Sequence, residues 1–222
     1  MTRARAARLP DVDAGPVRVR VPLSTRIDTE RLVLRAYRTD DVRAQRAFHL
    51  ENAEHLAPWS PRPRPGESPG SLVDAARKIA AARNDWRLDR GYAFAVLGRG
   101  GRGGLVARVA LNGIVRGSFQ SAYLGYLVGA SSEGRGLARE AVSAACTFAF
   151  GAARLHRVQA AIMPHNVRSL RLIAALGFRE EGLAERYLRI DGEWRDHRIF
   201  ACTAEEWAPP PSTHEVDAAG AE

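Results

Sequence analysis

The segment Ser131-Ser132-Glu133-Gly134-Arg135-Gly136-Leu137-Ala138 lies between two stretches of opposite character. The residues before it, Ala122 to Val128, have the density of aromatic and aliphatic side chains that is typical of a strand. After it, small and apolar residues recur at helical spacing, at Leu137, Ala141, Val142, Ala145, Phe148 and Ala149. The glycine-containing segment is therefore predicted to join a strand to the N-terminus of a helix.

Gly134 and Gly136 give this turn a specific chemistry. Because they have no side chains, they can adopt positive φ and let successive backbone N–H groups face an anion, and the helix dipole adds about half a positive charge. The turn is predicted to hold the pyrophosphate of a cofactor. It matches neither common nucleotide motif, since GxGxxG would need a glycine at Arg139 and a P-loop would need Gly-Lys before Ser or Thr. A plain strand-to-helix turn is the alternative.

A second motif lies further along the chain. Arg157 to Met163 is predicted to form a buried strand, and Asn166 is a strong N-cap residue for a helix from Val167 to Leu176. Gly177 takes the left-handed position expected after the end of that helix. Asn166 and Ser169 then indicate a small polar reaction centre beside the cofactor. The alternative is that both residues only cap the helix, with Asn166 accepting the N–H of Ser169.

The order of these motifs resembles that of the Gcn5-related N-acetyltransferases and, within that superfamily, of the RimJ/RimL-type protein N-terminal acetyltransferases. The resemblance extends from about Thr29 to Trp207. One departure is Ser131, which stands where the family has Gln or Arg at the start of the turn. The resemblance is carried by the glycine turn, by Asn166-Val167-Arg168-Ser169 with Gly177-Phe178, and by Thr29 to Arg35, Leu56 to Pro61, His156 to Val158 and Glu181 to His197.

The resemblance implies an α/β fold with a central, mostly antiparallel mixed sheet, splayed between its fourth and fifth strands, with helices on both faces. Residues 25–207 are predicted to form this acetyltransferase domain, between a disordered Arg-rich extension (1–24) and a disordered tail (208–222). The remaining predicted strands are Leu32 to Tyr37, Tyr92 to Leu97 and Leu105 to Val115, and the remaining predicted helices are Asp40 to Leu50 and Ser71 to Leu88.

The resemblance also implies direct transfer of an acetyl group from acetyl-CoA to an amine. A backbone N–H at a bulge in the fourth strand, at Leu127 or Val128, would stabilise the carbonyl oxygen, and Ser169 would hydrogen-bond the sulfur. Arg135, Arg139 and Arg171 can pair with cofactor phosphates or can be solvated helix-face residues. The predicted cofactor-binding residues are Leu127, Val128, Gly134, Arg135, Gly136, Leu137, Ala138, Asn166 and Arg171.

The general base stays open at the level of sequence. An α-amine has a pKa of about 7.7 to 8.0 against about 10.4 for lysine, so a weak, water-relayed base suffices. The glutamate of some RimL-type enzymes aligns with Leu188, and its role cannot be transferred. The candidates are Tyr187, Glu185 and His197, each with a structural alternative, and Tyr187 is grouped with Ser169 and Asn166 as the predicted catalytic set.

Trp59, between Pro58 and Pro61, lies in the loop that varies with the acceptor in the family. Its side chain is predicted to form one wall of the groove that binds the acceptor. The alternative is that its indole plugs a surface loop onto the core.

Composition limits the other classes of protein. The chain has 33 basic and 25 acidic residues and a formal charge of +8, but only Lys78 is a lysine, and no run of five like charges occurs. Cys146 and Cys202 fit reduced core residues, no Cys or His cluster predicts a metal, and the N-terminal residues lack the apolar run of a secretory signal. A cytoplasmic protein without a membrane partner is expected.

Three functions remain at this stage. The first is acetylation of a protein N-terminal α-amine, with a ribosomal protein as acceptor and weak association with the ribosome. The second is acetylation of a small amine such as a polyamine, an antibiotic or an aminoacyl-nucleotide toxin. The third is an RNA-binding or CoA-sensing protein without turnover. The chain is expected to be a monomer or a homodimer.

Overall fold

The computed structural model describes residues 19–100, 104–209 and 216–217 of the 222-residue chain. The strands are β1 (Arg26–Asp28), β2 (Leu32–Ala36), β3 (Gly91–Gly98), β4 (Leu105–Val115), β5 (Ser121–Val128), β6 (Arg157–Ile162), β7 (Arg179–Ile190), β8 (Glu193–Thr203) and β9 (Val216–Asp217). The helices are α1 (Val42–Glu51), α2 (Ala53–Leu56), α3 (Leu72–Arg87), α4 (Leu137–Phe150) and α5 (Val167–Ala175), with short 3₁₀ turns η1 (Thr39–Asp41), η2 (Ala57–Trp59) and η3 (Ala130–Ser132).

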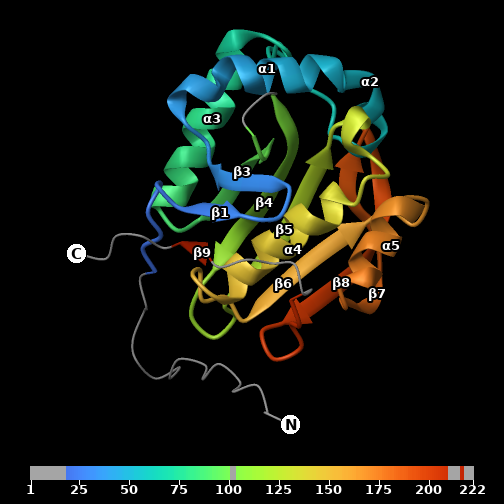
Figure 1. Ribbon diagram of the computed structural model, residues 1–222. Coiled ribbons are helices and arrows are strands. Elements are labelled where there is room, and N and C mark those ends of the chain that lie inside the picture. The colour runs from blue at the N-terminus through green and yellow to red at the C-terminus, as the bar shows by residue number, and fades with distance from the viewer. Residues whose placement is uncertain (1–18, 101–103, 210–215, 218–222) are drawn as a thin grey trace.

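The strands form one mixed sheet in the order β7-β8-β6-β5-β4-β3-β2-β1-β9 (Figure 1). Every neighbouring pair is antiparallel except β5 and β6. The parallel pair runs only from Ser121 opposite Arg157 to Leu124 opposite Ala160, and beyond these residues the two strands are no longer paired. The predicted mostly antiparallel sheet with a splay at this pair is confirmed.

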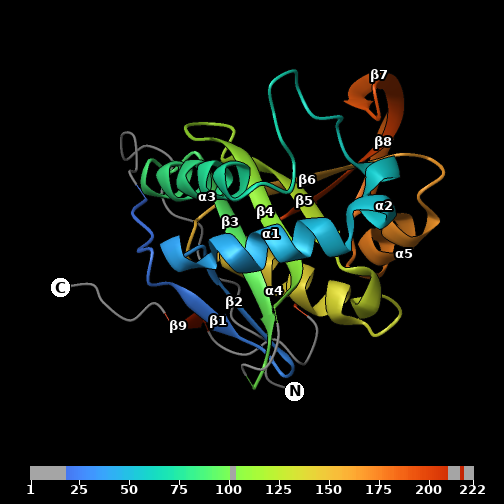
Figure 2. The same cartoon turned by 90° about the horizontal axis from the view of Figure 1, so that it is seen from above.

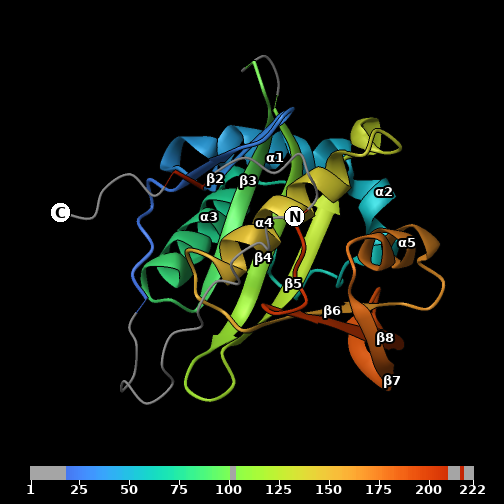
Figure 3. The same ribbon diagram turned by 60° about the horizontal axis from the view of Figure 1, so that its bottom comes forward.

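Helices cover both faces of the sheet, as predicted. Figure 2 shows α1 and α3 over one face, and Figure 3 shows α4 over the other. The side chains of β4 alternate accordingly, since Ala107, Val109 and Leu111 are buried in the core that contains α4. The intervening Arg108 reaches the opposite face, where its guanidinium lies over the ring of Tyr37. Arg108 and Tyr37 on that face line the cavity of the candidate active site.

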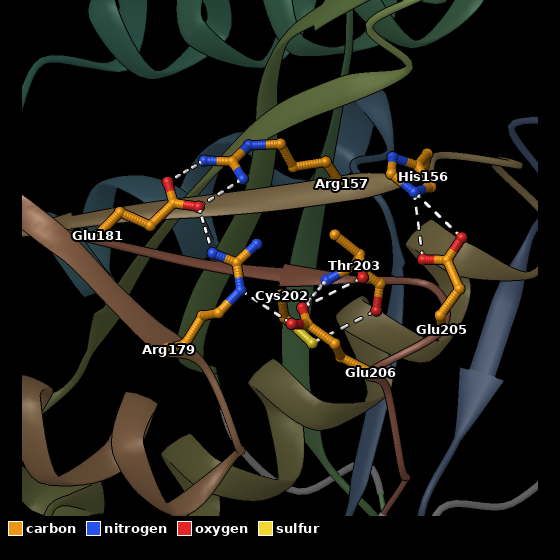
Figure 4. Close-up of polar contacts among 8 residues, drawn as sticks. All are labelled: His156, Arg157, Arg179, Glu181, Cys202, Thr203, Glu205 and Glu206. Atoms are coloured by element: carbon orange, nitrogen blue, oxygen red, sulfur yellow. Dashed lines mark hydrogen bonds and ion pairs between the residues drawn. The ribbon is translucent and has the colours of Figure 1, made fainter.

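A polar network fixes the hairpin of β7 and β8 against β6 (Figure 4). Arg157 on β6 donates two hydrogen bonds to Glu181 on β7, and Arg179 donates to Glu181 at 2.6 Å and to Glu206 at 2.8 Å. Glu206 in turn accepts the backbone N–H of Thr203, at the end of β8, at 2.9 Å. The Arg157 guanidinium lowers the pKa of Glu181 to about 2, with Arg179 adding to the effect and burial opposing it. The network therefore fixes the β7–β8 hairpin to β6, and this hairpin contributes to the candidate active site.

Both ends of the predicted domain carry contacts that the sequence analysis did not foresee. The indole of Trp86 donates to the carbonyl of Val21 at 3.0 Å, and Val21 and Leu23 pack against the core, although both fall within the predicted extension 1–24. At the other end, β9 lies within the predicted tail and pairs with β1. Residues 1–18, 210–215 and 218–222 lie outside the described residues, so disorder there stays a prediction.

Candidate active site

A cavity of about 350 Å³ opens where β5 and β6 separate. Its walls come from β4, β5, β6, the start of α5, the β7–β8 hairpin and the loop of η2. Five candidate site residues from the sequence line it, namely Trp59, Leu127, Asn166, Ser169 and His197. The segments that carry these five side chains are far apart in sequence, and the splay of the sheet brings them together.

The glycine turn has the geometry that its sequence predicts. Gly134 has φ of 69° and Gly136 has φ of 74°, so both occupy the left-handed region. Gly136 is the N-cap of α4, and no side chain caps this helix. The N–H groups of the first turn, including those of Leu137 and Ala138, are therefore available to an anion. A Cβ atom on Gly134 would point into open space, which leaves room for a phosphate at the turn.

A buried carboxylate that the sequence analysis missed holds this turn in place. Glu140, in the first turn of α4, accepts the hydroxyl of Thr29 at 2.6 Å, the backbone N–H of Arg31 at 2.8 Å and the Nε–H of Arg31 at 2.7 Å. Burial raises the pKa of Glu140, but these hydrogen bonds outweigh it, and the pKa is lowered overall. Arg31 also donates to the carbonyl of Arg135 at 2.8 Å. The Thr29-Glu30-Arg31 stretch thus ties the β1–β2 turn to the glycine turn.

The predicted phosphate-binding arginines differ in their surroundings. The side chains of Arg135 and Arg171 are exposed, one on the glycine turn and one on α5, so both can reach a ligand at the turn. Arg139 donates a long hydrogen bond of 3.5 Å to the carbonyl of Ala175 at the end of α5. Arg135 and Arg171 therefore stay as predicted phosphate partners.

A second ion pair across the turn was not predicted. Glu133 pairs with Arg168 on α5 and, on its other oxygen, with the ring of His55 on α2 at 3.2 Å. The turn is therefore linked to two helices on either side of the cavity.

The start of α5 combines a structural role with a position in the cavity. Asn166 is the N-cap and accepts the backbone N–H of Ser169 at 3.2 Å, so the capping interaction is confirmed. Both residues line the cavity, and Gly177 follows the helix with φ of 79°. The hydroxyl of Ser169 is not needed for the cap, which leaves it free to contact a ligand.

Tyr126 on β5 is a further polar group beside Ser169 that the sequence analysis did not identify. Its hydroxyl is buried and has no hydrogen-bond partner among the described residues, although the tyrosine lines the cavity. Burial raises the pKa of Tyr126 to about 12, an effect that the Ser169 hydroxyl opposes and that Cys146 reinforces. The phenol therefore stays protonated and can donate a hydrogen bond into the cavity.

The expected bulge at the end of β5 is wrong. Leu127 lies opposite Arg108 and Val128 opposite Ala107 in an unbroken register, and the irregularity in this pair of strands falls between Asn112 and Val115 of β4. The turn that follows β5 begins only after Val128, so the ladder has no local reason to bulge there. A bulge is not what supplies a free N–H in this chain.

The separation of β5 and β6 leaves backbone N–H groups of β5 free instead. In an antiparallel ladder, alternate residues bond to the neighbouring strand. The N–H of Gly129 donates to the carbonyl of Val106 at 3.0 Å, which places Leu127, two residues earlier, in the bonds to β4. The N–H groups of Tyr126 and Val128 therefore point to the edge that β6 has left. Of the two predicted oxyanion donors, Val128 has its N–H on this free edge, although Leu127 is the one of the two that lines the cavity.

Trp59 lines the cavity and stacks on His165, with ring centroids 5.5 Å apart, and its place in an acceptor groove stays a prediction. The loop that follows it is anchored to the β7–β8 hairpin, because Arg62 pairs with Asp191 at 2.7 Å and the N–H of Asp191 donates to the carbonyl of Ser60 at 3.1 Å. The β7–β8 hairpin and this loop therefore form one wall of the cavity.

The three candidate bases differ in their access to the cavity. His197 lines it and is 3% exposed, and its Nδ1 lies 2.9 Å from the carbonyl of Arg195. Since a carbonyl oxygen only accepts, the Nδ1–H donates this hydrogen bond, and Nε2 is the ring nitrogen that it leaves unused. Glu185 and Tyr187 do not line the cavity, and burial raises the pKa of Tyr187, with Tyr123 reinforcing the effect. Leu188, where some relatives have a base, lines the cavity without any proton-transfer group.

Two absences complete the picture of the described residues. In these ranges no helix combines the length and apolar character needed to cross a membrane. No three His, Cys, Asp or Glu side chains among them gather closely enough to hold a metal ion. Cys146 and Cys202 are both buried and free.

A splayed mixed sheet with an uncapped glycine turn between β5 and α4 is the architecture of an acyltransferase that uses coenzyme A. Residues 31–179 match the family model described as an acetyltransferase (GNAT) domain, and the chain belongs to this family of acetyl-CoA-dependent N-acetyltransferases. The predicted resemblance and the acetyl-CoA donor are confirmed. The glycine turn and the free edge of β5 are the parts of this structure that fit the donor.

Comparison with individual proteins shows which members of this family the chain resembles. The chain is 34% identical, over 83% of its length and 93% of the relative, to the [ribosomal protein uS5]-alanine N-acetyltransferase of Escherichia coli strain K12. It resembles the structure of Mycobacterium smegmatis RimJ in complex with CoA-disulfide with a TM-score of 0.77 and 31% identity, covering 86% of this chain and 91% of that one. It also resembles a ribosomal-protein-S5-alanine acetyltransferase from Vibrio fischeri, with a TM-score of 0.76, 27% identity, and coverage of 83% and 99%.

Proposed function

We propose that this enzyme acetylates the N-terminal α-amine of a protein that begins with alanine, and that a ribosomal protein is its acceptor in the cell. The observation that carries the proposal is the composition of the cavity: the described residues that line it include no Asp or Glu, and they include Arg108. A polyamine or a lysine side chain is a cation at neutral pH and would favour a carboxylate-lined site. An α-amine, with a pKa of about 7.7 to 8.0, enters such a cavity partly neutral.

The similarity to the uS5-alanine N-acetyltransferase of Escherichia coli supports alanine as the first residue of the acceptor. The side chain of Trp59 and the β7–β8 hairpin bound the acceptor side, where an N-terminus would enter. A ribosomal acceptor would place the enzyme in the cytoplasm, as the sequence predicts. The formal charge of +8 would favour weak, salt-sensitive association with ribosomal RNA.

The residues have separate roles in this proposal. Acetyl-CoA supplies the activated acyl group when bound. The N–H of Val128 lies on the free edge of β5 and would donate to the acyl oxygen, while the hydroxyls of Ser169 and Tyr126 would donate hydrogen bonds toward the sulfur. His197 would accept the proton of the acceptor amine at Nε2, directly or through a water. Tyr187, which does not line the cavity, would act on the orientation of His197, since their ring centroids are 5.7 Å apart.

The test is release of free thiol from acetyl-CoA with two panels of acceptors, short peptides that begin with Ala, Ser or Met, and small amines that include a polyamine. Turnover confined to the peptides, with the acetyl group located on the α-amine by mass spectrometry, is expected. Turnover only with small amines would refute the proposal. Ser169→Ala should lower kcat by about tenfold with little change in the KM for peptide, because it removes one hydrogen bond to the departing sulfur.

A further inference from the structure

Arg108 is a half-buried cation without a partner of opposite charge. It lies on β4, lines the cavity, and places its guanidinium carbon 5.8 Å from the centre of the Tyr37 ring. Its Nε is buried and makes no hydrogen bond within the described residues. Tyr37 is 2% exposed and lines the same cavity, and its buried hydroxyl makes no hydrogen bond of good geometry with the described residues, although Arg108 is close enough to oppose the rise that burial causes in the pKa of Tyr37. Two hydrogen-bond donors, the guanidinium of Arg108 and the hydroxyl of Tyr37, therefore lie together at the cavity.

Other shielded arginines of this chain have carboxylate partners. Arg35 pairs with Asp41 at 2.7 Å, Arg116 pairs with Asp89, and Arg157 pairs with Glu181, and the side chains of these three arginines are only 12% to 17% exposed. Arg108 makes no ion pair with any carboxylate in the part of the chain that the structure describes. A partly buried guanidinium without an anion is unfavourable, so a bound ligand is the natural source of the missing charge.

We propose that Arg108 and Tyr37 form a subsite for a carboxylate of the acceptor, so that the enzyme prefers protein N-termini with Asp or Glu at the second or third residue. This inference rests on the proposed function, because it assigns the acceptor's chemistry at the same cavity. A carboxylate can accept two parallel hydrogen bonds from a guanidinium and a third from the phenol. No Asp or Glu lining the cavity competes for these donors.

The spacing of an extended peptide sets the position of the acidic residue. An extended peptide advances about 3.5 Å per residue, so the side chains of the second and third residues lie within about 4 to 7 Å along the chain from the α-amine that reacts in the cavity. The cofactor phosphates are not the expected partner, because Arg108 projects from the face covered by α1 and α3, whereas the glycine turn begins α4 on the opposite face.

The experiment compares kcat/KM for four peptides that start with Ala and differ at the second residue, as Glu, Gln, Lys or Ala. A matching set varies the third residue. Each set is measured with the wild-type enzyme, with Arg108→Met, with Arg108→Lys, and with Arg43→Met as a control, since Arg43 is exposed on α1 away from the cavity. The KM for acetyl-CoA is measured in parallel for every variant.

The wild-type enzyme is expected to prefer Glu over Gln by about tenfold or more at one of the two positions, the usual range for a charge-assisted hydrogen-bonded pair. Arg108→Met should abolish this ratio, Arg108→Lys should keep part of it, and Arg43→Met should keep all of it. Because the wild-type ratio and its decrease in high salt need no variant, the proposal can be judged even if Arg108→Met fails to fold.

Three results would overturn the subsite. Equal rates with Glu and Gln in the wild-type enzyme, while Ala-peptides are still acetylated, would reject the subsite and leave the proposed function standing. A rise in the KM for acetyl-CoA in Arg108→Met, equal for all peptides, would assign Arg108 to the cofactor instead. Failure to acetylate any peptide would reject the proposed function and the subsite together.

Discussion

Replacing Glu140 by Gln should weaken the attachment of the glycine turn without changing the size of the side chain. The carboxylate accepts two donors at Oε1, the hydroxyl of Thr29 and the backbone N–H of Arg31, and a third at Oε2, the Nε–H of Arg31. An amide oxygen can replace only one of these carboxylate oxygens. If it keeps the two donors at Oε1, the new NH₂ group faces the Nε–H of Arg31, and two donors then oppose each other.

The magnitude follows from these contacts. Glu140→Gln removes one hydrogen bond between charged groups, worth about 1.5 to 3 kcal/mol where both groups are buried. The side chain of Arg31 is 47% exposed, although that of Glu140 is only 6% exposed, so solvent screening reduces the value to about 1 to 2 kcal/mol. In a domain of this size, 1 kcal/mol shifts Tm by about 2 to 4 °C, so Tm should fall by about 2 to 8 °C.

The substitution should also raise the KM for acetyl-CoA, because Arg31 holds the carbonyl of Arg135 within the turn. A loss of about 1 kcal/mol in binding corresponds to about a fivefold rise in KM, with kcat unchanged. Steady-state kinetics and thermal unfolding would measure both quantities. Glu30→Gln is the matched control, since Glu30 is the exposed neighbour of Arg31. Equal Tm and equal KM for Glu140→Gln and wild type would refute this account of the turn.

Three further predictions concern the turn, the base and the hairpin. Gly134→Ala should raise the KM for acetyl-CoA and lower stability by about 1 kcal/mol, whereas Gly177→Ala, with a similar φ of 79° against 69°, should lower stability alone; equal KM values in the two variants would contradict a phosphate site at the turn. His197→Gln should lower kcat by about a hundredfold with little change in the KM for peptide, and an unchanged kcat would exclude His197 as the base. Glu181 has its pKa lowered from 4.5 to about 2, so it stabilises the folded state above about pH 4.5 and loses this effect as the pH falls toward 2. Between pH 6 and pH 3, the free energy of unfolding of Glu181→Gln, measured in urea, should therefore fall by about 1 to 2 kcal/mol less than that of the wild type. Identical decreases would show that the network in Figure 4 carries no net stability.

Local sequence was sufficient for most of the elements. The helix α4 begins at Leu137 directly after two glycines, and α5 begins after Asn166, because glycine conformation and side-chain capping act within a few residues. The strand β4 covers Leu105–Val115, as its pattern predicts. Gly134, Gly136 and Gly177 all have the positive φ expected of them.

Features that depend on pairing between distant segments were predicted less well. The free N–H of Val128 comes from the separation of β5 and β6, not from the expected bulge, because the register of a sheet is set by neighbouring strands. The base candidates could not be ranked, since only the fold shows that His197 lines the cavity and that Tyr187 and Glu185 do not.

The sequence by itself determined the order of elements, the anion-binding turn and the family, because these depend on motifs of a few neighbouring residues in a fixed order. Only the tertiary structure decided which distant side chains share the site. Glu140 meets Arg31 across more than a hundred residues, and Arg108 meets Tyr37 while making no ion pair with a carboxylate of the described residues. The physical reason is that burial and charge pairing are set by contacts in space, and a buried donor without a partner becomes visible only when all of its neighbours are known.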